Sequence, residues 1–179
     1  MIICYLLIAI NVTVFILIRN GKINVDNYYL SYYEVSVRKE YHRLITSAFM
    51  HEGILHLAMN MISLFNIFSA LTYVFNPFII LLIYFLTIVI GHIFTIMMRH
   101  NNQDDNLGSI GASGGVCGLI GAYLVVMYLV FKGFATEEII RSIGSIFLIS
   151  IVPGIDGKSH INCLACGLVV GAILFFIMY

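Results

Sequence analysis

Apolar residues gather into six runs along the chain, separated by polar segments of which all but the first are short. A helix that crosses a membrane needs about 20 mostly apolar residues. The predicted spans are Ile2–Ile18, Ile54–Tyr73, Pro77–Met98, Ile110–Phe131, Ile139–Val152 and His160–Tyr179. The fifth is short and carries Arg141 near its start, which suits an extension toward Phe134 or a thin patch of bilayer. The pattern predicts an all-α membrane protein that forms one domain over residues 1–179.

The only long polar stretch lies between the first two spans, over residues 19–53. It holds half of the charged residues and a group of tyrosines, namely Tyr28, Tyr29, Tyr32 and Tyr33. Tyrosines together with charges are typical of a segment at the membrane–water interface. We therefore expect a long interfacial first loop.

Composition supports the membrane assignment and excludes several classes. Of 179 residues, 61% are hydrophobic and 10% charged, whereas about a quarter of residues are charged in soluble domains. The net charge of zero offers no basic surface for nucleic acid. The chain begins almost directly in apolar residues without a cleavage site, so the first span is expected to remain as an anchor.

The cysteines lie in apolar segments and are interpreted as small buried side chains. They are Cys4, Cys117, Cys163 and Cys166. The last two form a C-x-x-C, but without a second pair or a thioredoxin-like context it is weak evidence for redox chemistry or zinc. No metal or cofactor is predicted.

Unusual polar residues stand at the beginnings of the second, fourth and sixth spans. They are His56 with Asn60, Ser113, and His160. If all six segments cross, these beginnings share one face of the membrane. Strongly polar groups inside a membrane are costly and are functional hypotheses by default.

Ser113 and His160 have the chemistry of a nucleophile and its base. A serine hydroxyl needs a base to take its proton, and histidine is the commonest one. Gly111, Gly114 and Gly115 leave room around Ser113 for a carbonyl group. The alternative is that these glycines only allow close helix packing, together with Gly118, Gly121, Cys163, Gly167 and Gly171.

His56 and Asn60 are four residues apart and therefore lie on one helical face. Both can donate hydrogen bonds to a developing oxyanion, or they can link neighbouring helices. His51 suits either an ordered loop or a core position. His92 and His100 match no other group and are assigned structural or solvent-facing roles.

Three sequence blocks resemble the rhomboid intramembrane serine proteases of the minimal six-helix bacterial type. They are EYHRLITSAFMHEGILHLAMNMISL (40–64), GASGGVCGLIGAY (111–123) and IDGKSHINCLACGLVVG (155–171). The six-span plan with a long first loop is similar too. The resemblance implies a six-transmembrane-helix rhomboid-like bundle in the bacterial cell membrane. It also implies an endopeptidase that cleaves single-span membrane proteins within the lipid bilayer.

The resemblance also implies a role for each matching residue. Ser113 is expected to be the nucleophile and His160 the general base, in a dyad without an acidic member. His56, Asn60 and the Ser113 backbone N–H are expected to form the oxyanion hole. The expected supporting residues are His51 and Arg43, which order the surroundings and the first loop, Gly111 and Gly114 beside the serine, and Gly167 in helix packing.

The chain departs from the family pattern at several positions. His42-Arg43 replaces a usual Trp-Arg, and Cys117 replaces an aromatic residue that can stack on the catalytic histidine. Asn162 and Cys163 replace glycines. Because Cys163 is larger than glycine, the fourth and sixth spans are expected to lie slightly further apart. These departures bear on rate and rigidity rather than on the reacting groups.

The distribution of Lys and Arg conflicts with the orientation that the resemblance implies. With both termini in the cytoplasm, seven of the nine Lys and Arg residues lie on the outer side, against the positive-inside rule. We follow the family orientation, because a folded interfacial loop can escape that rule. Two other functions are an inactive relative that binds membrane clients, and a small transporter whose polar residues line a pathway.

Overall fold

The computed structural model describes residues 1–99, 108–132, 144 and 157–179. Its long helices are α1 (Ile2–Arg19), α3 (Ile54–Leu71), α4 (Pro77–Arg99), α5 (Ser113–Phe131) and α7 (Gly157–Met178). All five are long and apolar enough to cross a membrane. They match five of the six predicted spans to within three residues at each end. The predicted fifth span, Ile139–Val152, lies outside the described residues.

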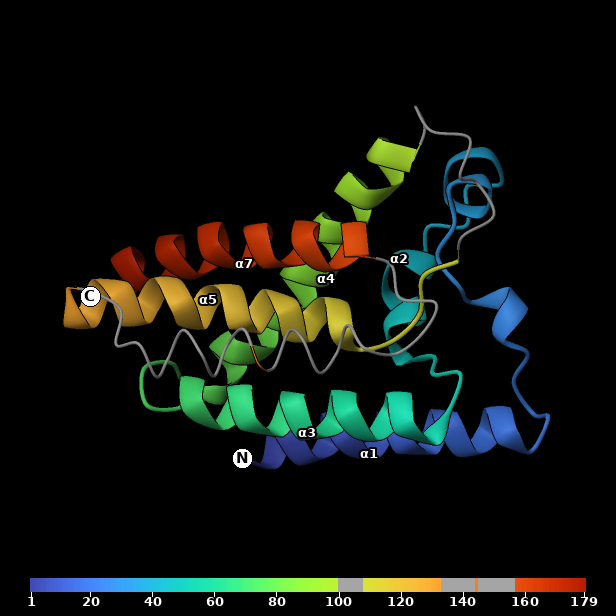
Figure 1. The fold of residues 1–179 in the computed structure, drawn as a ribbon, viewed down its shortest axis with the longest axis horizontal. Coiled ribbons are helices and arrows are strands. Elements are labelled where there is room, and N and C mark those ends of the chain that lie inside the picture. The colour runs from blue at the N-terminus through green and yellow to red at the C-terminus, as the bar shows by residue number, and fades with distance from the viewer. Residues whose placement is uncertain (100–107, 133–143, 145–156) are drawn as a thin grey trace.

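The first loop is folded into short helical turns. They are η1 (Val25–Asn27), the π-helical turn η2 (Tyr33–Val37), α2 (Arg43–Thr46) and η3 (Ser47–Phe49). These turns lie on the right-hand side of Figure 1, above the right-hand ends of α1 and α3. Leu30 in this loop forms an isolated antiparallel bridge with Ser109, which lies just before α5.

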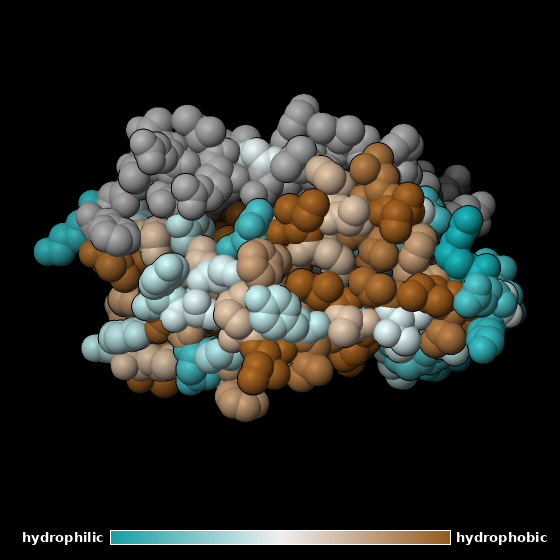
Figure 2. Space-filling model, turned by 90° about the horizontal axis from the view of Figure 1, so that it is seen from below, coloured by the Kyte–Doolittle hydropathy of each residue, from teal (hydrophilic) through white to brown (hydrophobic). Residues whose placement is uncertain are grey.

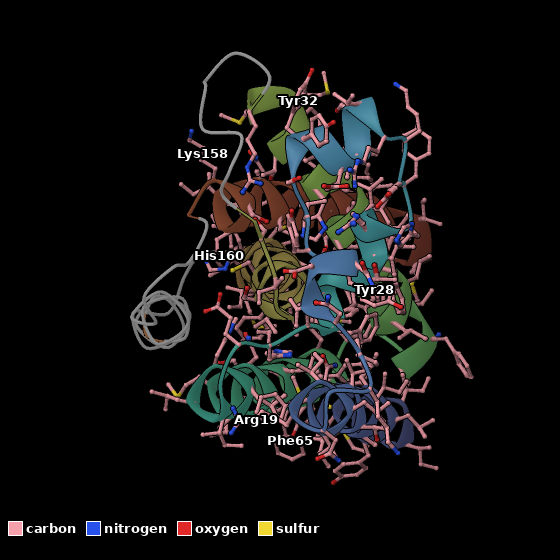
Figure 3. The ribbon with its side chains drawn as sticks, turned by 90° about the vertical axis from the view of Figure 1, so that its right-hand side faces the viewer. Arg19, Tyr28, Tyr32, Phe65, Lys158 and His160 are labelled. Carbon is pink, nitrogen blue, oxygen red and sulfur yellow. The ribbon has the colours of Figure 1, made fainter. Side chains whose placement is uncertain are left out.

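Helix α5 is the central helix of the bundle. It packs against α7, α4 and α3, while α1 lies on the outer side of α3 (Figure 3). In the most apolar 18-residue stretch of α5, 67% of the residues are buried, compared with 22% in the corresponding stretches of α1 and α7. The core contains Tyr84, Phe68 and Phe75, all essentially inaccessible to solvent. A serine at the start of α5 is therefore surrounded by other helices rather than by lipid.

The outer surface is the one expected of a membrane protein. Large apolar side chains on every long helix remain exposed, as on Ile2, Leu55, Phe94 and Val169. Figure 2 shows hydrophobic residues over the middle of one face and hydrophilic residues gathered at the right-hand end, where the first loop lies. The chain is an all-α membrane protein with several membrane-spanning helices.

The helices α3, α5 and α7 begin at the same end of the bundle, the end that carries the first loop (Figure 1). This is the arrangement that alternating spans require. It brings the polar residues at the three helix starts to one depth.

Candidate active site

Ser113 and His160 meet at the starts of α5 and α7. The His160 Nε2 lies 2.8 Å from the Ser113 Oγ, and this hydrogen bond is buried. Ser113 is 5% exposed and His160 7% exposed. The hydroxyl therefore does not point into lipid, and the imidazole lies at the same depth. This is the geometry that a serine and its general base require.

Close packing of glycines brings these two helices together. A Cβ atom added to Gly167 on α7 would collide with the Gly118 carbonyl oxygen on α5, and one added to Gly121 would collide with the Leu164 carbonyl oxygen. Small residues at such positions let helix backbones approach within a membrane. Gly167 therefore lies where a packing residue was expected.

Cys163, which was expected to hold α5 slightly away from α7, packs its side chain against both α4 and α5. The Cys163 Sγ lies between these two helices, because it would collide with a Cβ added to Gly91 on α4 and would lie 3.2 Å from a Cβ added to Gly114 on α5. The larger side chain therefore occupies a notch in a third helix. The α5 and α7 backbones remain in direct contact at Gly118 and Gly167.

His56 and Asn60 on α3 face the backbone just before Ser113. A Cβ added to Gly111 would lie 2.7 Å from the His56 Nε2 and 3.4 Å from the Asn60 Nδ2. Gly111 has a φ of +113°, a conformation that L side chains rarely adopt. Glycine is thus required here both by the backbone and by the two polar side chains beside it.

The polar atoms of His56 and Asn60 are buried and unpaired. Within the described residues, neither ring nitrogen of His56 and neither side-chain polar atom of Asn60 has a hydrogen-bond partner. A buried unsatisfied polar group costs about 1–3 kcal/mol, and such groups in native structures usually have a functional or solvent-related explanation. Both side chains are available to bind an oxygen atom that is brought to the site.

The segment before Ser113 is held by several hydrogen bonds. The Gly111 N–H donates to the Ser47 carbonyl oxygen at 2.9 Å, and the Ala112 N–H donates to the His51 Nε2 at 3.4 Å. Leu30 and Ser109 exchange backbone hydrogen bonds of 3.0 and 2.9 Å. The first loop therefore fixes the backbone that leads into α5.

His51 is a neutral base in this arrangement. Burial, together with the nearby His56, lowers the pKa of His51 to about 3. The neutral ring can accept the Ala112 N–H, which an imidazolium cannot do. The His51 and His56 rings lie edge to face with centroids 5.0 Å apart, so His51 packs against the polar pair on α3.

Arg43 links several segments of the first loop through hydrogen bonds and ion pairs. Its guanidinium donates to the backbone oxygens of Asp26 at 2.8 Å and Tyr29 at 3.1 Å. It also pairs with Glu40 at 2.7 Å and Glu34 at 3.6 Å, and only 3% of Arg43 is exposed. Arg43 lies away from Ser113 and touches the loop rather than the reacting groups.

Two residues near the site were not among the predicted site residues. Arg99, at the end of α4, donates to the Leu30 carbonyl oxygen at 3.2 Å and the Ser109 hydroxyl at 2.9 Å. His92 lies within 2.7 Å of the Leu44 carbonyl oxygen through its Nδ1, and a Cβ on Gly114 would lie 3.2 Å from the His92 Nε2. The available sequence signal was a charged or imidazole side chain within a membrane span.

A cavity of about 320 Å³ lies beside the site. It is lined by Val25, Asp26, Tyr29, Glu52, Gly108 and Ile110. Ile110 precedes Gly111 directly, and Glu52 follows His51. Among the residues that the structure describes, no group of three or more His, Cys, Asp or Glu side chains is arranged to hold a metal ion.

Comparison with known proteins decides the family. The family model of the rhomboid domain matches residues 38–179. The chain belongs to the rhomboid family. The match covers α3, α4, α5 and α7 and begins within the first loop, so it includes every residue that was expected in the site.

Individual relatives include both a protease and an inactive protein. The chain is 29% identical over 184 residues to the rhomboid protease GluP of Bacillus subtilis (strain 168), covering 95% of this chain and 34% of GluP. It is 30% identical over 138 residues to the inactive RHOMBOID-like protein 8 of Arabidopsis thaliana, covering 74% of this chain and 38% of that protein. RHOMBOID-like protein 4 of the same plant is 27% identical over 138 residues, covering 74% of this chain and 34% of its own length. The chain thus spans little more than a third of the length of these relatives.

Proposed function

We propose that this chain is an intramembrane serine endopeptidase that uses Ser113 and His160 as its catalytic dyad. The observation that carries the proposal is the hydrogen bond of 2.8 Å between the Ser113 Oγ and the His160 Nε2. A serine and a histidine from two membrane helices meet in a buried position, although burying both polar groups costs free energy. The similarity to GluP, a rhomboid protease, supports the proposal.

The reaction begins with attack of the Ser113 Oγ on the carbonyl carbon of the substrate peptide bond. In the tautomer protonated at Nδ1, the His160 Nε2 accepts the hydroxyl proton as the new bond forms. The same proton then passes to the leaving amine, and the C–N bond breaks. Water, with its proton taken by His160, hydrolyses the resulting ester and restores Ser113.

His56, Asn60 and the Ser113 backbone N–H are proposed to bind the oxyanion of the tetrahedral intermediate. Ser113 is the first residue of α5, and the first N–H groups of a helix have no partner within the helix. These N–H groups also lie at the positive end of the helix dipole. The unpaired polar atoms of His56 and Asn60 lie next to Gly111, two residues before Ser113, which supports this role.

The proposed substrates are single-span membrane proteins that enter from the lipid. A transmembrane helix hides its carbonyl groups in its own hydrogen bonds, so local unwinding near small, helix-breaking residues should favour cleavage. Water reaches the dyad from the end that carries the first loop, where the cavity beside Ile110 opens. We propose the bacterial cell membrane as the location, with the first loop on the outer side.

The alternative is a rhomboid protein that binds membrane clients without cutting them. The similarity to the inactive RHOMBOID-like protein 8 makes this the second candidate. The transporter hypothesis has less support, because His56, Asn60, Ser113 and His160 gather at one end of the bundle rather than along a pathway through it.

Cleavage of a model substrate separates these functions. The purified full chain is reconstituted with a single-span protein that carries small residues near one membrane face, and products are identified by mass spectrometry. We expect one cut within or beside the span, and no cut with Ser113→Ala or His160→Ala. Cleavage that persists in both variants refutes the dyad, and an intact substrate that co-purifies with the parent protein favours client binding.

A further inference from the structure

We infer that Asn162 and Thr95 position the catalytic histidine by fixing the rotation of α7 against α4. The inference rests on the proposed function and adds two positioning residues to it. Asn162 is one of the residues at which the chain departs from the family pattern, which usually has glycine there. Its side chain binds a neighbouring helix two residues after His160.

A directional chain of hydrogen bonds joins the two helices. The Asn162 Nδ2 donates to the Thr95 Oγ1 at 3.0 Å, and the Thr95 hydroxyl donates to the Gly91 carbonyl oxygen at 2.7 Å. Because a hydroxyl has one proton, the Thr95 oxygen is left as the acceptor for Asn162. The Asn162 amide also lies 3.4 Å from the Met98 Sδ.

The next residue on α7 strengthens the same contact. The Cys163 side chain occupies the notch that Gly91 leaves in α4. Gly91 therefore contributes twice, since its carbonyl oxygen accepts the Thr95 hydroxyl and its missing Cβ receives the thiol. Thr95 is inaccessible to solvent, so water does not compete for its hydroxyl. Residues 162 and 163 together hold one turn of α7 on one turn of α4.

This attachment controls where the His160 imidazole points. Residues 160 and 162 are about 200° apart around the helix, so Asn162 contacts α4 while His160 faces Ser113 on α5. An imidazole about 6 Å from the helix axis moves by about 1 Å when the helix turns by about 10°. A displacement of that size can reduce a rate by about 10²-fold.

Position 117 carries a thiol in place of a ring that could pack on the imidazole, so the attachment to α4 offers another way to orient α7. Cys117, four residues after Ser113, is a small buried thiol on the same helical face. Asn162 contacts α4 on the side of α7 that faces away from Ser113. It should therefore affect the chemical step and leave substrate binding unchanged.

The test compares Asn162→Leu, Thr95→Val and the double variant in cleavage of the single-span substrate. The amount of folded enzyme is counted by complete labelling of Ser113 with a fluorophosphonate. We expect kcat per labelled serine to fall about three- to twentyfold in each single variant, the range expected for loss of one interhelical hydrogen bond in a membrane. The double variant should lose no more than either single variant, and KM should not change.

Two further variants separate positioning from folding. Thr95→Ser keeps the hydroxyl and should keep the parent kcat. Thr87→Val removes a buried hydroxyl from the same helix, and it should also keep the parent kcat. Among the described residues, this hydroxyl donates to the Ile83 and Tyr84 carbonyl oxygens of α4 itself. A parent kcat per labelled serine in Thr95→Val, or additive losses in the double variant, overturns the inference alone. A parent protein that neither cleaves nor labels overturns the proposed function as well.

Discussion

Replacement of Gly111 by alanine tests whether the backbone before Ser113 forms one site with the His56 and Asn60 side chains on α3. The added Cβ would lie 2.7 Å from the Nε2 and 2.9 Å from the Cε1 of His56. Contacts under about 3 Å do not occur between such atoms, so the His56 ring or the 108–112 segment must move. The φ of +113° adds backbone strain of about 1–3 kcal/mol.

Each effect has its own expected magnitude. Displacement of one oxyanion donor typically lowers kcat by about 10²–10³-fold, whereas backbone strain alone lowers stability without changing the chemistry of folded molecules. Gly21→Ala is the matched control, because Gly21 also has a positive φ, of +67°, but nothing lies within 4 Å of the added Cβ. Gly21→Ala should therefore lose stability and keep its activity per folded molecule.

The assay measures kcat and KM on the single-span substrate, normalised to folded protein, together with thermal unfolding in detergent. We expect Gly111→Ala to lose about 10²-fold or more in kcat and Gly21→Ala to lose none. Equal kcat values in the two variants would refute the reasoning, because His56 would then have no function that depends on its distance from Gly111.

Three further predictions concern the packing of α7 at Gly167, the role of Asn60, and the dependence of stability on pH. Gly167→Ala should lower the free energy of unfolding by about 1–3 kcal/mol, measured by chemical denaturation in detergent, because the new Cβ meets the Gly118 carbonyl oxygen. Gly157→Ala should not lower it, because nothing lies within 4 Å of a Cβ added there. Equal losses in the two variants would contradict this packing. Asn60→Leu should reduce kcat about 10²-fold without reducing stability, since it removes two buried unpaired atoms; a large fall in the melting temperature would mean that Asn60 has a structural partner. The folded-state pKa of His51 is lowered to about 3, so below about pH 6.5 the unfolded chain binds a proton that the folded chain does not. The free energy of unfolding should therefore fall by about 1.4 kcal/mol per pH unit toward pH 3. His51→Gln should weaken this dependence in acid denaturation, and an unchanged dependence would contradict the assignment.

The spans were predictable because each is a long apolar run, and their alternation placed the starts of the second, fourth and sixth at one depth. The pairing of Ser113 with His160 followed from that depth and from the small residues between their helices. The rhomboid domain match confirms the family that the sequence blocks resemble. The site roles of these residues remain predictions until activity is measured.

Other features depend on contacts that no periodicity reveals. The contact of the Cys163 side chain with Gly91 can be predicted only if α4 is known to lie beside α7. The sequence pattern suggested only a wider spacing between α5 and α7. Asn162 was noted as a departure, but its partner Thr95 is 67 residues away in the sequence. Arg99 reaches back to Leu30 in the first loop, and His92 to the Leu44 backbone. These long-range polar contacts fix the site and carry no local signal.

The most direct test of the dyad is the site of covalent modification by a fluorophosphonate, located by peptide mass spectrometry on the reconstituted full chain. We predict one adduct per chain, on Ser113, with none on the neighbouring Ser109. The His160→Ala variant should form that adduct at least a hundredfold more slowly, because the hydroxyl proton then has no acceptor. Modification of Ser113 at the same rate with and without His160 would contradict the account.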